Sequence, residues 1–159
     1  MTPTRKPNRI ENYDYSSIGA YFITICTVNR AKIFRDPVGA DIIRPKNTRL
    51  SSVGKIVEQS ILQIADHYEN VVVDKYCVMP NHIHMILRIE ANDRGRMISA
   101  PTVSTVIGSM KRWVSRQVGR PSWQKSFHDH AIRNQQDYDE IWEYIENNPL
   151  KYINNDPPD

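Results

Sequence analysis

The chain is 159 residues long, 40% of them hydrophobic, and carries a formal net charge of +3 at pH 7. This length and apolar content suit one folded domain with its own core. All apolar runs are much shorter than the ~18 residues of a membrane span, and the first residues lack the apolar stretch of a secretory signal. The sequence therefore argues against a membrane or secreted protein and predicts a cytoplasmic one.

Hydrophobic patterns predict four strands and three helices in the order β-α-β-β-α-β-α. Strands are expected where β-branched and aromatic residues gather or alternate, and helices where apolar residues recur every three or four positions. The last helix should stop before Pro149, because the residue before a proline disfavours helical geometry. The expected strands are 20–27, 70–78, 81–90 and 122–128, the helices are 53–64, 104–118 and 135–147, and the loop 35–47 includes a short strand at 40–43.

This order of elements predicts an α/β (α+β) sandwich, in which helices pack on an antiparallel sheet. No internal repeat or second domain is visible. We expect one domain over residues 16–152, between a flexible basic tail at 1–15 and a polar tail at 153–159.

The two cysteines, Cys26 and Cys77, form no Cys-x-x-Cys motif and lie in strand-like apolar runs. That placement favours reduced, buried thiols in a cytosolic protein. Cys77 precedes His82 by five residues, which leaves a Cys/His zinc site open. No second cysteine follows at the spacing of structural zinc sites, so the sequence favours the simpler interpretation.

Two histidines, His82 and His84, stand one residue apart after the turn signal Pro80-Asn81. From residue 82 to 89 the pattern has a period of two, as in a half-buried strand. Successive side chains on a strand point to opposite faces, so both imidazoles project from one face and could bind one divalent metal ion. For an isolated His-x-His pattern, two surface histidines on a sheet would be the better interpretation.

The last predicted helix carries two stripes. An apolar stripe, expected to pack on the sheet, contains Tyr138, Ile141, Trp142 and Ile145, and a polar stripe beside it contains Asp137, Glu140, Tyr144 and Asn148. If this helix lies across the histidine face, the residues form a phosphoryl-transfer centre. Tyr144 would attack phosphorus, and the Asn148 side-chain oxygen would be the third ligand of a Mg²⁺ or Mn²⁺ ion.

Positive charge is concentrated between residues 101 and 133, where six basic residues face one acidic residue, a net charge of +5. Acidic residues gather just afterwards, in the last predicted helix. A basic stripe beside a metal site fits a phosphate-binding protein, although a solvated helix face would look similar.

Five segments together resemble the REP-associated tyrosine transposases, single-tyrosine relatives of insertion-sequence transposases within the HUH endonuclease group. The resemblance extends from about Tyr13 to Tyr152, and the pairing of His-x-His with Tyr-x-x-x-Asn-Pro is far more specific than either half. The segments are YDY at 13–15, YFITICTVNR at 21–30, MPNHIH at 79–84, WQKSFHDH at 123–130 and YIENNPL at 144–150.

The resemblance implies a ferredoxin-like or RRM-like fold and a metal-dependent enzyme that nicks and rejoins single-stranded DNA near hairpin-forming palindromes. It makes His82 and His84 the metal pair, Asn148 a further ligand, and Tyr144 the nucleophile that forms a 5′-phosphotyrosine. It implies a divalent metal (Mg²⁺ or Mn²⁺) without a nucleotide cofactor, a nucleoid-associated bacterial protein, and a monomer or homodimer. The basic residues expected to contact DNA phosphates are Arg5, Lys6, Arg9, Lys111, Arg112, Arg116 and Arg120.

Three other functions fit part of the pattern. A non-catalytic or inactivated RRM-like module would explain the fold order and the basic stripe, but the aromatic RNP1 pattern is missing from the third strand. A metal-dependent phosphodiesterase would use water as the nucleophile and leave Tyr144 structural. An inactive transposase relic would keep only the fold and DNA binding. Trp113 and Trp123 could stack on bases, although core packing is the expected fate of each.

Overall fold

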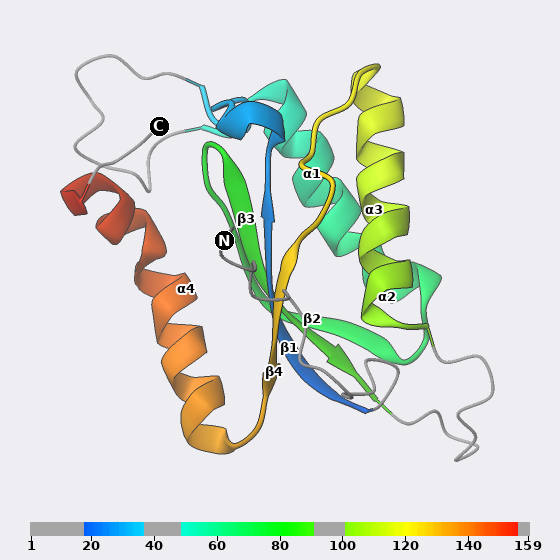
Figure 1. Ribbon diagram of the computed structural model, residues 1–159, viewed down its shortest axis with the longest axis vertical. Helices are drawn as coiled ribbons and strands as arrows, with labels where there is room; N and C mark the ends of the chain where they lie inside the picture. Colours follow the sequence, from blue (N-terminus) through cyan, green and yellow to red (C-terminus); the bar gives the residue numbers. More distant parts are fainter. Residues whose placement is uncertain (1–17, 37–48, 91–100, 156–159) are drawn as a thin grey trace, which may run out of the picture.

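The structure is a computed structural model that describes residues 18–36, 49–90 and 101–155, with side chains up to residue 147 in the last helix (Figure 1). The expected short strand at 40–43 and both tails lie outside the described residues. The elements are β1 (Gly19–Cys26), a 3-10 turn η1 (Val28–Arg30), α1 (Ser52–Leu62), α2 (Ile64–His67), β2 (Val71–Val78), β3 (His82–Ile89), α3 (Val103–Val118), β4 (His128–Ile132) and α4 (Gln135–Asn155).

The four strands form one sheet in the order β2-β3-β1-β4, and each neighbouring pair is antiparallel. This order places each helical crossover over one intervening strand, which is the split βαβ arrangement of ferredoxin-like folds. Helices α1, α2 and α3 cover one face of the sheet, and α4 runs along the other face (Figure 1). The predicted α+β sandwich is confirmed.

The main core lies between the sheet and the helices α1 and α3. The alternating residues of β3 that point to this side are fully buried, as the period of two predicts. Helix α3 contributes a matching apolar stripe, whose buried members recur at helical spacing. The buried residues from these two elements are Ile83, Met85, Leu87, Ile89, Val103, Val106, Ile107, Met110 and Val114.

The start of α1 is locked to the segment that follows β1. The Ser51 hydroxyl accepts a hydrogen bond from Gly54 N at 3.0 Å and donates one to Ile33 O at 2.5 Å. Gly54 allows the helix to approach the backbone closely, because a Cβ atom there would lie 2.0 Å from Phe34 O. The N-cap and the glycine therefore fix where α1 crosses the sheet.

Two predicted boundaries were wrong. The fourth strand is His128–Ile132, not 122–128, because it pairs with β1 from Thr24 towards Ala20. Upstream, Trp123 forms only an isolated bridge and turns into the core, where it is 8% exposed. The last helix does not stop before Pro149 but continues to Asn155. A proline removes one helical donor, and the backbone on both sides remains helical here.

Candidate functional site

The two histidines lie at the beginning of β3. Their side chains are on the face of the sheet that α4 covers, because the His84 ring meets Tyr144 of α4 and the His82 ring lies beside it. His82 is opposite Cys26 on β1, and His84 lies between Thr24 on β1 and Cys77 on β2. Their ring centroids are 4.7 Å apart with an interplanar angle of 73°. The strand therefore holds the two imidazoles side by side, as the alternation predicted.

Each imidazole is oriented through its Nδ1 atom. His82 Nδ1 lies 2.7 Å from Asn81 Oδ1, and His84 Nδ1 lies 2.9 Å from Thr24 Oγ1. An amide oxygen only accepts hydrogen bonds, so His82 carries its proton on Nδ1 and keeps the Nε2 lone pair. The Thr24 hydroxyl can accept a hydrogen bond from Nδ1 of His84 in the same way, and in that tautomer the Nε2 atoms of both rings can bind a metal ion. Such supporting hydrogen bonds are typical of ligating histidines.

Burial keeps both imidazoles uncharged at neutral pH. It lowers the pKa of His82 to about 4, with a further contribution from the positive charge of Arg30. Burial likewise lowers the pKa of His84 to about 3, and neighbouring His82 adds to the effect. Because a metal binds the unprotonated ring, the pair is ready for a cation over the whole physiological range.

Tyr144 comes to this pair from α4. Its ring centroid lies 5.5 Å from that of His84, in an edge-on arrangement, and the residue is 40% exposed. Phe22 of β1 joins the two, because its ring stacks on His84 at 5.3 Å and meets Tyr144 edge-on at 6.1 Å. The structure therefore brings the predicted nucleophile beside the predicted metal pair and leaves it accessible to solvent.

The sequence interpretation assigned no role to Phe22. The signal was present, because Phe22 and Thr24 share a face of β1. Only the strand register, in which Thr24 is opposite His84, shows that this is the histidine face.

Polar contacts with β2 and β3 hold α4 against the face of the sheet that carries the two histidines. The Tyr138 hydroxyl donates a hydrogen bond of 2.8 Å to Asp74 Oδ2, and Arg88 binds the same carboxylate through Nε at 2.9 Å and Nη2 at 3.0 Å. Lys75 pairs with Glu146, and its ammonium lies 4.7 Å from the centre of the Trp142 ring. These groups determine the position of the helix that carries the tyrosine.

The apolar stripe predicted on α4 is only partly buried. Ile145 is 1% exposed, whereas Trp142, which was expected to pack on the sheet, is 38% exposed. The Trp142 ring instead contacts Lys75 and stacks near Tyr138, with ring centroids 6.3 Å apart. The buried stripe of α4 is narrower than predicted, because the helix packs only on the sheet. In the described part of the chain no second helix lies beside α4 to cover more of its surface.

Asn148 is one helical turn beyond Tyr144 on α4, but its side chain lies outside the described residues. Within the described residues, no group of three or more His, Cys, Asp or Glu side chains is placed to hold a metal ion. His82 and His84 fit a divalent ion by their donor atoms, spacing and protonation. The assignment of Asn148 as the third ligand stays a prediction.

Four of the basic residues predicted to contact DNA lie in the described part of the chain, and they are not beside Tyr144. Lys111, Arg112 and Arg116 are on α3, which covers the opposite face of the sheet, and Arg120 directly follows its C-cap Gly119 (Figure 1). The Lys111 ammonium donates hydrogen bonds to Gln124 O at 2.7 Å and to Lys125 O at 3.3 Å. Arg5, Lys6 and Arg9 lie outside the described residues. Trp123 belongs to the core and Trp113 packs partly buried against it, as expected.

Fold and site together define an antiparallel α/β sandwich with a two-histidine pair facing a helical tyrosine. The chain belongs to the family described as IS200-like transposases, whose model matches residues 16–148. Among the described residues, no helix is both long and apolar enough to cross a bilayer.

Individual relatives agree with the family. The chain is 28% identical to an uncharacterized protein of Haemophilus influenzae, over 92% of this chain and 88% of that protein. It is 25% identical to a second protein of the same species, named "Putative REP-associated tyrosine transposase", over 90% of this chain and 78% of that protein. A solved REP-associated tyrosine transposase bound to a REP hairpin has a similar fold, with a TM-score of 0.65 and 21% identity over 91% of this chain and 74% of its own.

Proposed function

We propose that this protein is a metal-dependent single-stranded DNA endonuclease and strand transferase that acts at hairpin-forming sequences. The observation that carries the proposal is the position of the Tyr144 ring, 5.5 Å from that of His84 and on the same chain. A tyrosine on the far side of the sheet from the histidines would leave only a binding module. The hairpin substrate is inferred from the relative whose structure holds a REP hairpin.

His82 and His84 would hold a divalent ion through their Nε2 atoms, with Asn148 as a further ligand. When bound, Mg²⁺ or Mn²⁺ would polarise a phosphodiester oxygen and stabilise the charge that develops on it. The protein prepares the pair by burying both rings and by holding Nδ1 with Asn81 and Thr24. A mixed imidazole and amide-oxygen set suits these ions better than a thiolate set would.

In the proposed reaction the Tyr144 phenolate oxygen attacks phosphorus and forms a phosphotyrosine bond. The bond from phosphorus to the 3′ oxygen breaks, and that oxygen takes up a proton to become a 3′-hydroxyl. The downstream DNA therefore stays attached to the protein through its 5′ phosphate. A phenolate is also a fair leaving group, so a 3′-hydroxyl can reverse the step and rejoin the strand, which favours strand transfer over simple hydrolysis.

The direct test is to trap the covalent complex with labelled single-stranded hairpin oligonucleotides and Mg²⁺ or Mn²⁺. A label at the 3′ end should migrate with the protein in a denaturing gel, whereas a 5′ label should leave on a shorter strand with a 3′-hydroxyl. Tyr144→Phe should abolish the adduct. Tyr76→Phe is the matched control, because this phenol lies on the core face and bonds Glu58 instead.

The metal role has its own test. His82→Ala and His84→Ala should abolish adduct formation and keep most of the DNA affinity, and excess chelator should have the same effect on the wild-type protein. An adduct that survives Tyr144→Phe, or full activity in chelator, would contradict the mechanism. DNA binding with no adduct across a broad pool of hairpins would instead support the non-catalytic binding module.

A further inference from the structure

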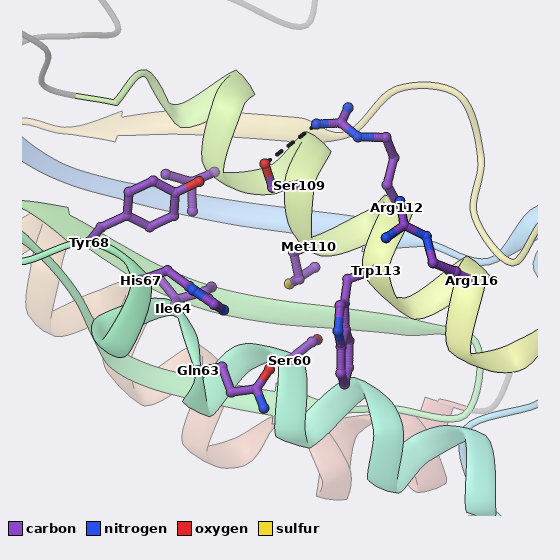
Figure 2. A pocket seen from close by; sticks show the side chains of 11 residues that line it. Ser60, Gln63, Ile64, His67, Tyr68, Ser109, Met110, Arg112, Trp113 and Arg116 are labelled. Carbon is purple, nitrogen blue, oxygen red and sulfur yellow. Dashed lines mark hydrogen bonds between the residues drawn. The ribbon is translucent and has the colours of Figure 1, made fainter.

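A groove of about 480 Å³ lies between α2 and α3 (Figure 2). These helices cover the face of the sheet opposite α4, which carries Tyr144 (Figure 1). Its volume is within the ~300–1,000 Å³ that small-molecule sites occupy. One wall comes from α1 and α2, with Gln63 and His67, and the other comes from α3, with Trp113 and the two arginines Arg112 and Arg116. The proposed transposase chemistry on the other face does not use any of these side chains.

Among the described residues, those that line the groove include two arginines and no carboxylate. Arg112 and Arg116 are one helical turn apart and exposed, and helix α3 has no acidic residue anywhere in Val103–Val118. Neither arginine forms an ion pair with a described residue. Arg112 has only a long hydrogen bond of 3.4 Å to the Ser109 hydroxyl. Two unneutralised guanidinium groups at neighbouring positions can bind an anionic phosphate, often through paired hydrogen bonds.

The rest of the groove suits an aromatic base. Trp113 and Tyr68 are partly buried against the core and line the groove with their remaining surface, and Ile64 and Met110 add apolar contacts between them (Figure 2). Aromatic rings next to arginines are the usual platform for unpaired bases, which stack on the ring while the cations hold the backbone. Double-stranded DNA would offer no base face to these rings, because its bases are stacked on one another within the helix.

We propose that the groove between α2 and α3 binds an unpaired nucleotide of a nucleic-acid strand, with its phosphate on Arg112 and Arg116 and its base against Trp113. The ligand would be a single-stranded part of the DNA, distant from the phosphate that Tyr144 attacks. The inference rests on the proposed function only in taking DNA as the ligand. The protein would then contact its substrate on both faces of the sheet.

The test measures binding in a Tyr144→Phe background, so that it does not depend on cleavage. The probes are a hairpin with single-stranded flanks and the same stem without unpaired nucleotides. The double variant Arg112→Gln and Arg116→Gln should bind the flanked hairpin at least tenfold more weakly. The slope of log K against log salt should fall by about 0.7, because the two arginines hold one phosphate and each neutralised phosphate of a single strand adds ~0.7 to the slope. Trp113→Leu, which keeps an apolar side chain, should weaken binding about tenfold without changing the slope.

The control is the double variant Arg49→Gln and Lys55→Gln, which removes the same charge from exposed positions outside the groove. An equal loss of affinity in this control would mean that only net charge matters and would overturn the proposal. An equal loss for the stem alone would also overturn it, because the ligand would then be a duplex backbone. If the arginine variant binds the flanked hairpin with unchanged affinity while the wild-type protein still forms the Tyr144 adduct, the proposed nucleotide site in the groove is wrong. The proposed cleavage chemistry would not be affected by that result.

Discussion

The hydrogen bond from Tyr138 to Asp74 joins the tyrosine helix α4 to the sheet, and Tyr138→Phe removes it without changing the ring. A hydrogen bond to a charged group contributes about 1.5–3 kcal/mol. Asp74 is also bound by Arg88, and water can reach Tyr138, so we take the lower end, about 1.5 kcal/mol. That free energy corresponds to a tenfold change in an equilibrium constant. The ratio of undocked to docked α4 should therefore rise about tenfold.

Amide hydrogen exchange measures this ratio directly. Amides in the middle of α4 should exchange about tenfold faster in Tyr138→Phe than in the wild-type protein, while amides of β1 stay unchanged. Adduct formation at Tyr144 should slow by less than tenfold as long as the docked helix remains the majority. Tyr76→Phe provides the matched control, because it removes a tyrosine–carboxylate hydrogen bond to Glu58 on the opposite face. Unchanged exchange of α4 in Tyr138→Phe would refute the reasoning.

The same contact predicts how docking depends on pH. Burial raises the pKa of Asp74, but the hydrogen bonds from Arg88 and Tyr138 outweigh it and hold the pKa below the ordinary value of 3.8. Because the folded pKa is lowered, the stabilisation is present above about pH 4 and is lost as pH falls through the folded value. After correction for the intrinsic rate, exchange of α4 amides should accelerate on acidification below pH 4. Asp74→Asn should remove this contribution to the pH dependence.

Three further substitutions test the packing and the metal pair. Ile145→Ala should lower the stability of the packed α4 by about 2–5 kcal/mol, because the side chain is 1% exposed. The loss should appear as faster amide exchange in α4, and unchanged protection of these amides would contradict the packing of Ile145. Asn81→Ala should weaken Mn²⁺ binding about 10–100-fold in calorimetric titration, because His82 loses its Nδ1 partner; an unaltered Kd would exclude that support. Gly54→Ala should lower the melting temperature by about 10 °C, because its Cβ would lie 2.0 Å from a carbonyl oxygen. We take the resulting strain as ~3 kcal/mol, and each kcal/mol lowers Tm by about 2–4 °C. An unchanged Tm would mean that α1 can move away from the carbonyl without loss of stability.

Local periodicity predicted most of the elements and much of the core. The alternation from 82 to 89 identified which side of β3 carries the histidines, because side-chain direction in an extended strand repeats every two residues. The inner face of α3 followed from helical spacing in the same way, and its buried residues include Val106, Ile107 and Met110. These features depend only on neighbours in the sequence.

The start of the fourth strand, which the sequence placed wrongly, depends on a distant partner. The fourth strand begins at His128 because its partner β1 lies alongside from there, and no feature of residues 122–128 encodes that register. The bidentate contact between Arg88 and Asp74 was missed for the same reason, since the two residues meet across neighbouring strands. The basic residues of α3 were grouped with the site by charge alone, although the sheet separates them from it.

The sequence by itself determined the chemical groups of the site: two imidazoles on one strand face, and a tyrosine followed one turn later by an asparagine on a helix. Only the tertiary structure decided that α4 lies across the histidine face, with Tyr144 beside His84. The residues are sixty positions apart, and long-range contacts such as that between Tyr138 and Asp74 bring them together. Strand and helix periods describe the direction of each side chain within its own element, whereas the packing of one element on another depends on contacts between distant parts of the chain.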